Sequence, residues 1–118
     1  MRTLVTALFL TATLSPALAQ TASPAITAAD AKDHVGHTAV VRASVTAVRT
    51  ARSGVTFIDM DGLYPDNRFA AVIFVDDIAK FPGVKTLEGK TVTVSGPVQL
   101  YQGRPEIILR SAAQLTAK

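Results

Sequence analysis

Apolar and polar residues alternate along several short stretches of this chain, and each such stretch predicts a β-strand. The clearest one spans residues 91–100, where Val92, Val94 and Val98 share one parity and mostly polar residues fill the other. A period of two places alternate side chains on opposite faces of a strand, so one face is buried and the other meets solvent. Pro97 lacks an amide donor, so we expect it at an edge or an opening of the sheet.

The longest alternating stretch spans residues 38–49 and predicts the first strand. Val41, Ala43 and Val45 share the inward parity, and the small alanine side chain leaves room for a bulkier residue opposite. Val48 falls on the other parity, which indicates a bulge or a bend near the end of this strand.

Shorter apolar runs predict three more strands, at residues 55–59, 69–75 and 106–110. Turn-forming residues separate the strands and predict a loop at 50–54, a long connection at 61–68 and a turn at 101–105. The run at 69–75 is apolar on both faces, so one face belongs to the core, and a helix or a partner covers the other. Residues 111–118 are expected to form a tail.

Two short helices are expected beside the strands. Thr27 is a good N-cap for the first helix, and Gly36 ends it after one or two turns. Asp76 and Asp77 are N-cap candidates for a second helix at residues 78–81, which is followed by a proline and a glycine.

Five strands, with a helical turn between the third and the fourth, favour an all-β fold, a five-stranded Greek-key barrel. Gly96 lies at the middle of the fourth strand, and glycine permits the sharp coiling that a small barrel needs. A small β-sandwich stays open as the alternative, because strand patterns alone do not fix the topology.

The first 19 residues have the pattern of a secretory signal peptide. Arg2 precedes an apolar run at 4–14, and Ala17 and Ala19 suit the pocket of a signal peptidase, which predicts cleavage before Gln20. The run is far shorter than the ~20 residues that a membrane span needs, which disfavours the alternative of an uncleaved anchor. We therefore expect a signal peptide at 1–19, a disordered leader at 20–25 and one domain at 26–118, in a periplasmic or secreted protein without a membrane span after cleavage.

Charge and composition restrict the function without selecting it. The chain carries 12 basic and 9 acidic residues, a net charge of +3, and loss of Arg2 with the signal peptide leaves +2. No two lysines or arginines are adjacent, whereas many nucleic-acid-binding proteins carry a concentrated basic run. The balance permits polyanion binding without demanding it. The absence of cysteine excludes disulfides, a lipid anchor and thiolate chemistry.

The order of several segments resembles that of small exported bacterial OB-fold proteins, a family often described as nucleic-acid-binding. The segments are ADA and HVG (29–31, 34–36), SGVTFI (53–58), YPD (64–66), FAAVIF (69–74), GKTVTVSG (89–96) and YQGRPEI (101–107). The resemblance covers nearly all of residues 26–115 and implies a ligand site across the second and third strands. That site would lie between the loops that join strands one to two and four to five. Because OB-folds also bind oligosaccharides and proteins, the resemblance implies a shape rather than one ligand.

Six arginines and tyrosines near these loops are the candidate nucleic-acid-binding residues. They are Arg49 and Arg52, Tyr64 and Arg68, and Tyr101 and Arg104. Arginine suits phosphate, and a tyrosine ring can stack on a base at ~1–3 kcal/mol per base. The alternative is that the arginines are solvated loop residues and that the tyrosines close the rim of the barrel.

No motif in the sequence points to catalysis, a cofactor or a metal. The chain has no Gly-x-Ser-x-Gly elbow and no phosphate-binding glycine-rich loop. His34 and His37 have a spacing that metal ligands use, but Gly36 interrupts the helix and no third ligand lies nearby. The run DMDG at 59–62 has the opening of a calcium loop, yet Ala70 stands where that loop needs a bidentate glutamate.

Two hypotheses of function follow. The first is a non-catalytic module that binds single-stranded nucleic acid or a similar extended polyanion. The second is a protein-interaction or assembly module of the cell envelope, which would dock a partner on the apolar outer face of the third strand, Ala70, Val72 and Phe74. A continuous positive groove would favour the first hypothesis, and a neutral apolar patch would favour the second.

Overall fold

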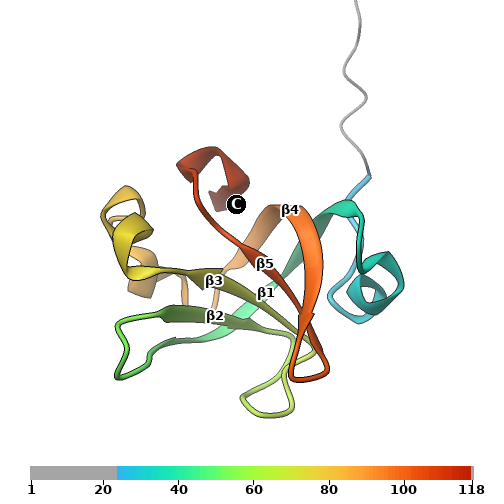
Figure 1. Cartoon of the computed structure of the whole chain (residues 1–118), viewed down its shortest axis with the longest axis horizontal. Coiled ribbons are helices and arrows are strands. Elements are labelled where there is room, and N and C mark those ends of the chain that lie inside the picture. Colours follow the sequence, from blue (N-terminus) through green and yellow to red (C-terminus); the bar gives the residue numbers. More distant parts are fainter. Residues whose placement is uncertain (1–23, 118) are drawn as a thin grey trace, which may run out of the picture.

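Five strands are hydrogen-bonded in a closed ring in the computed structural model, which describes residues 24–117 (Figure 1). The ring runs in the order β1-β2-β3-β5-β4 and closes where β4 pairs with β1. Its strands are β1 (Thr38–Thr50), β2 (Thr56–Met60), β3 (Phe69–Ile73), β4 (Thr91–Tyr101) and β5 (Arg104–Ile108). The predicted all-β, five-stranded OB-fold is confirmed, and closure of the ring argues against the sandwich alternative.

The predicted signal peptide at residues 1–19 and most of the predicted leader lie outside the described residues. Ile26 forms an isolated parallel bridge with Val41, so the chain contacts the ring from that residue onward. Within residues 24–117, no helix is long and apolar enough to cross a membrane.

The strand β1 belongs to two ladders. Residues 38–44 pair with β4, whereas residues 45–50 pair with β2. The register with β2 shifts between Val45 and Ala47, which confirms the bulge expected in this strand. As a result, Val48 is buried although its parity in the sequence differs from that of Val41 and Val45.

The strand β4 changes partner at Gly96 and Pro97. Residues 91–97 pair with β1, and residues 98–101 pair with β5. Gly96 has a φ of +150°, and a Cβ atom at this position would lie 2.8 Å from Ile107 Cγ2. Only glycine lets the two strands approach so closely, which agrees with the coiling predicted here.

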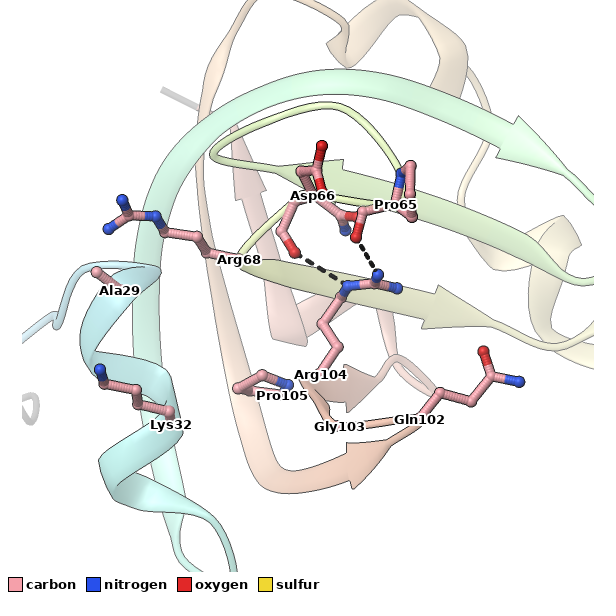
Figure 2. A pocket seen from close by; sticks show the side chains of 10 residues that line it. Ala29, Lys32, Pro65, Asp66, Arg68, Gln102, Gly103, Arg104 and Pro105 are labelled. Carbon is pink, nitrogen blue, oxygen red and sulfur yellow. Dashed lines mark hydrogen bonds between the residues drawn. The ribbon is translucent and has the colours of Figure 1, made fainter.

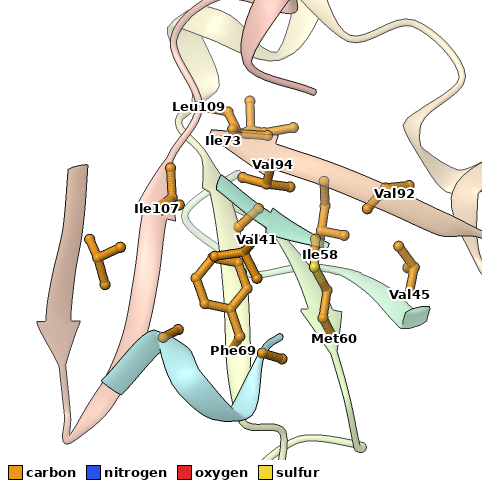
Figure 3. Close-up of a cluster of buried hydrophobic side chains, with 14 of the residues drawn as sticks. Val41, Val45, Ile58, Met60, Phe69, Ile73, Val92, Val94, Ile107 and Leu109 are labelled. Carbon is orange, nitrogen blue, oxygen red and sulfur yellow. The ribbon is translucent and has the colours of Figure 1, made fainter. Parts of the chain in front are cut away.

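The hydrophobic core fills the interior of the ring (Figure 3). Its largest fully buried side chains come from four strands and the segment after β5: Phe69, Ile58, Met60, Ile73, Ile107, Leu109 and Val41. All five residues of β3 are buried, as expected for a strand that is apolar on both faces. The short helix η1 (Ala29–His34) adds Ala31 to this core, together with the preceding Ala28.

The helices are short 3₁₀ segments, and the sequence predicted their ends less well than their positions. Ala28, not the predicted Thr27, is the N-cap of η1, although the hydroxyl of Thr27 accepts a hydrogen bond from the Asp30 amide at 3.2 Å. The next helix, η2 (Val75–Lys80), begins before the position predicted from Asp77. Asp77 lies inside its first turn, with Oδ1 2.8 Å from Lys80 Nζ, so it pairs within the helix instead of capping it. A further helix, η3 (Val84–Leu87), was not predicted.

The last residues form structure that the prediction of a tail missed. Ser111 and Gln114 form a capping box around η4 (Ala112–Gln114), in which the Ser111 amide donates a hydrogen bond to Gln114 Oε1 at 3.0 Å. The strand β6 (Leu115–Ala117) then pairs antiparallel with β4. The S-x-x-Q spacing of a capping box was visible in the sequence.

The turn between β4 and β5 is tighter than predicted. Tyr101 pairs with Arg104, so only Gln102 and Gly103 form the turn, with φ of +51° and +76°. Arg104 and Pro105 therefore lie in β5 and not in a loop. Two central residues with positive φ give a twist that suits the flanking strands.

Candidate nucleic-acid interface

The outward-facing residues of the ring form a row across all five strands. Successive partners in this row are Ala47, Asp59, Ala70, Glu106 and Gln99. Cross-strand partners project from the same face of a sheet, so the row places two carboxylates on the outer face with one alanine between them. Both carboxylates belong to buried residues, and each needs a partner.

The Asp59 carboxylate accepts hydrogen bonds from Arg49 and Asn67. Arg49 Nε and Nη2 donate to the two carboxylate oxygens, the second at 3.0 Å, and Asn67 Nδ2 donates at 3.3 Å. The hydrogen bond to Asp59 raises the pKa of the Arg49 guanidinium above its usual range, although burial acts in the opposite direction. Arg49 lies near the end of β1, and Asp59 neutralises its charge.

Tyr64 brings two of the predicted arginines together. The Cζ atom of Arg49 lies 4.0 Å from the centroid of its ring, and that of Arg104 lies 5.3 Å away. Arg104 also donates from Nε to the carbonyl of Asn67 at 2.9 Å and from Nη2 to the carbonyl of Pro65 (Figure 2). We call Arg49, Tyr64 and Arg104 the tyrosine cluster. It fixes the β2–β3 connection to the β4–β5 hairpin.

A hollow of about 590 Å³, the polar hollow, lies beside this cluster (Figure 2). It is lined by η1, the β2–β3 connection and the β4–β5 hairpin, through Ala29, Lys32, Pro65, Asp66, Asn67, Arg68, Gln102, Gly103, Arg104 and Pro105. Lys32, Arg68 and Arg104 bring three positive charges, against the one carboxylate of Asp66. The excess of positive charge suits an anionic ligand.

Arg68 has a carboxylate neighbour that leaves its charge largely available. Its Nε lies 3.6 Å from Asp61 Oδ2, and the two side chains are 64% and 49% exposed. Exposed ion pairs of this kind contribute little free energy, ~0–1 kcal/mol, so a phosphate can compete for the arginine.

A second hollow of about 380 Å³, the apolar hollow, lies on the outer face of the ring. Its lining residues come from the first loop, four strands and the residue after β3: Ala51, Ser53, Val55, Phe57, Val72, Phe74, Gln99, Tyr101 and Glu106. Three of them are aromatic, and the rings of Phe74 and Tyr101 are 41% and 53% exposed. Flat rings at an exposed surface can stack on a flat ligand.

Glu106 and Gln99 are the polar pair of the apolar hollow. Gln99 Nε2 donates to Glu106 Oε1 at 2.9 Å. Burial raises the pKa of the Glu106 carboxyl above its ordinary value of 4.5, although the hydrogen bond from Gln99 and the positive charge of Arg104 act in the opposite direction. The carboxylate is thus held in a site that disfavours its charge.

The β4–β5 hairpin borders both hollows. Tyr101 and Arg104 are direct cross-strand partners, and Arg104 and Glu106 are two residues apart in β5, so all three project from one face. Arg104 lines the polar hollow, whereas Tyr101 and Glu106 line the apolar hollow. Figure 1 shows the hairpin tip and the β2–β3 connection at the same end of the ring.

The structure groups most of the six predicted site residues. Arg49, Tyr64 and Arg104 form the tyrosine cluster, Arg68 lines the polar hollow and Tyr101 lines the apolar hollow. Arg52 stands apart and is exposed in the first loop, between two residues that line the apolar hollow. The first loop and Tyr101, the last residue of β4, border the apolar hollow, whereas the turn residues Gln102 and Gly103 border the polar hollow.

Sequence reasoning missed four other residues of this face, which are Lys32, Phe57, Gln99 and Glu106. It named Phe74 only as part of a face for a protein partner. The outward parity of Gln99 in the predicted fourth strand was a usable indication, and so was the parity of Phe57 in the second. Neither showed which residues would meet across strands.

Within residues 24–117, no three histidine, aspartate or glutamate side chains lie close enough together to hold a metal ion. In the run DMDG, the carboxylate oxygens of Asp59 already accept hydrogen bonds from Arg49 and Asn67. Asp59 and Met60 lie in β2, and only Asp61 and Gly62 of this run belong to the β2–β3 connection.

Searches against protein-family models and against curated proteins find no match to this chain. Among solved structures, it is similar to a protein from Leishmania major described as an aspartyl-tRNA synthetase, with a TM-score of 0.56 and 13% identity over 86% of this chain. The aspartyl tRNA synthetase from Entamoeba histolytica gives a TM-score of 0.47 and 16% identity over 72% of this chain. This chain matches only 22% and 19% of those two proteins. At such low identity, the first similarity supports the fold alone.

Proposed function

We propose that this chain is a non-catalytic, exported OB-fold module that binds single-stranded nucleic acid on the outer face of its ring. One observation carries the proposal: in a single hairpin, Arg104 lines the polar hollow with its excess of positive charge, and Tyr101 lines the apolar hollow with its aromatic rings. A single strand offers phosphates and bases side by side, and it needs both kinds of surface next to each other. A ligand with charge alone or rings alone would use only one hollow.

The residues of the face divide into two roles under this proposal. Phosphates lie against Lys32 and Arg68 in the polar hollow and against the exposed Arg52 at the first loop. Bases stack on Tyr101 and Phe74, at ~1–3 kcal/mol per base. The tyrosine cluster positions the connection between β2 and β3 and keeps the hairpin in place.

Three further observations support parts of the proposal. The structural neighbour from Leishmania major is named as a tRNA synthetase, a protein that acts on a nucleic acid. Export to the periplasm or the exterior is supported by the signal-peptide pattern at residues 1–19. The lack of a nucleophile motif in the sequence supports a binding role without catalysis.

A salt-dependent titration tests the proposal. A labelled oligonucleotide of about 12 nucleotides, within the range of OB-fold site sizes, is titrated with the mature chain at several salt concentrations. We expect the logarithm of the binding constant to fall with the logarithm of the salt concentration, with a slope of about −0.7 for each phosphate neutralised.

Matched variants locate the site. Replacement of Lys32 and Arg68 by alanine should make the slope less negative by about 1.4, because two phosphate contacts are lost. Replacement of Lys85 and Lys90 removes the same charge from residues that line neither hollow, and it should leave the slope nearly unchanged. The proposal is abandoned if the oligonucleotide fails to bind at low salt, or if both double variants weaken it equally.

A protein partner is the second candidate function, and the exposed Phe74 and Val75 at the end of β3 favour it. Ala70 and Val72 are only 3% exposed, so the apolar patch is smaller than predicted. A neutral oligosaccharide could also stack on the aromatic rings of the apolar hollow. Either ligand would bind with little salt dependence, so the titration separates both from nucleic acid.

A further inference from the structure

Glu106 is a buried acid whose hydrogen bonds are incomplete. The residue is 7% exposed, yet it lines the apolar hollow. Within residues 24–117, Oε1 accepts one hydrogen bond from Gln99, whereas no side chain donates to Oε2. A carboxylate offers about four acceptor sites, so this group can accept further donors from a ligand in the hollow.

The apolar hollow has the lining and the volume of a small-molecule site. Phe57, Phe74 and Tyr101 supply aromatic rings, and the volume of about 380 Å³ lies within the range of small-molecule sites, ~300–1,000 Å³. The carboxylate repels phosphate, so the backbone of a strand would stay at the cationic polar hollow. The base would then point toward Glu106.

A flat base suits this hollow better than a cationic side chain does. Lysine could also pair with a carboxylate between aromatic rings. However, the Arg49 guanidinium already lies 4.9 Å from the centroid of the Phe57 ring, and the positive charge of Arg104 already acts on Glu106. A second cation would meet these charges, whereas a neutral base would not.

We propose that Glu106 and Gln99 bind the Watson–Crick edge of an unpaired guanine, an inference that rests on the proposed function. Guanine presents two adjacent donors, N1–H and the N2 amine, which match the two oxygens of the carboxylate. Its O6 acceptor matches the second N–H of the Gln99 amide, because the first is used by Glu106. Cytosine and adenine offer one donor group beside an acceptor, and uracil or thymine offers one donor between two acceptors. Single strands leave this edge open for a protein to bind.

The test compares oligothymidines of about 12 nucleotides that carry one central guanine, inosine, adenine or cytosine. Fluorescence anisotropy at low salt measures each affinity. We expect the guanine strand to bind about tenfold tighter than the adenine and cytosine strands, as for one bidentate base contact. Inosine, which lacks the N2 amine, should fall between them.

Two variants connect the preference to the pair. Glu106→Gln replaces one carboxylate oxygen by an amide donor, so it should bring the ratio of the guanine-strand affinity to the adenine- and cytosine-strand affinities close to one. Glu88→Gln removes an equal charge at an exposed position outside both hollows and should change nothing. Circular dichroism checks that each variant is folded.

The outcomes separate this inference from the proposed function. Equal affinity for all strands, or a guanine preference that survives in Glu106→Gln, overturns the guanine site and leaves strand binding intact. If no strand binds, the proposed function fails, and saturation-transfer NMR with 5′-GMP and 5′-AMP tests the guanine site by itself. Stronger saturation of GMP than of AMP, lost in Glu106→Gln, upholds the guanine site. Equal saturation of the two nucleotides overturns it. A lysine-rich peptide tests the alternative occupant. If this peptide displaces the strand from the wild-type chain but not from Glu106→Gln, the hollow binds a cationic side chain, and the guanine site is overturned.

Discussion

Removal of Arg49 should destabilise the fold by leaving a buried carboxylate without its cation. Asp59 is fully buried, and in the variant Arg49→Met its remaining side-chain donor is Asn67. Breaking a buried ion pair in this way costs ~3–5 kcal/mol. The Arg49 side chain is 35% exposed, so water can partly replace it, and we expect a loss of about 3 kcal/mol. That is a large part of the ~5–15 kcal/mol that stabilises a small domain.

Urea unfolding of the mature chain, followed by far-ultraviolet circular dichroism, measures this loss. The matched control is Asp59→Asn, which leaves the arginine with access to solvent and should cost less than Arg49→Met. The double variant removes both charges and should be more stable than Arg49→Met alone, since no buried charge is left unpaired. A cost for Arg49→Met below about 1 kcal/mol, or a double variant less stable than that single one, would refute the reasoning.

Three further predictions concern β4 and β5. Gly96→Ala should destabilise the fold by about 1–3 kcal/mol in urea unfolding, because its Cβ atom would lie 2.8 Å from Ile107 Cγ2; no loss would contradict the close approach. Because the pKa of Glu106 is raised in the folded chain, its contribution to the free energy of unfolding falls as pH rises from about 4.5 through that raised pKa. Glu106→Gln should reduce this fall, and an unchanged pH profile would contradict it. Tyr101→Leu should weaken oligonucleotide binding about 5- to 100-fold without a change in unfolding, because the ring is 53% exposed.

Alternation and short apolar runs were enough to predict the five strands, but they left both a barrel and a sandwich open. A period of two is a property of local sequence, and the five predicted strands are all present. Two irregularities were predictable as well: Val48 broke the parity of β1 where the register shifts, and Gly96 marked the place where β4 changes partner. Both depend on one residue and its neighbours in sequence.

Short elements and their ends were less predictable. The apolar residues Phe74 and Val75 continue the pattern of β3, yet the chain turns into η2 there. Pro105 indicated a turn but lies in β5, since the two preceding residues already complete a tight turn. The strand β6 has three residues, which is too short for a periodic pattern to show.

The candidate site depended on registers that the sequence does not contain. Arg49 and Asp59 are ten residues apart, and they meet because the shifted register pairs Ala47 with Asp59 and puts both charged side chains on the outer face. Glu106 meets Gln99 only through the β4–β5 register. The sequence placed the arginines and tyrosines near the right loops. It did not show that Asp59 and Glu106 lie beside them, because that depends on the registers of the paired strands.

The division of β1 between two ladders also determines when the fold can be completed. The second half of β1 pairs with β2, which follows it directly, whereas the first half pairs with residues 91–97. Because the chain is synthesised from its N-terminus, β1, β2 and β3 can pair early, while Ala39 and Val41 still lack their partners in β4. Contacts between such distant residues slow folding, toward the ~millisecond-to-second range of β-rich domains. Until β4 arrives, the first half of β1 is the part of the nascent protein that most needs protection from other chains.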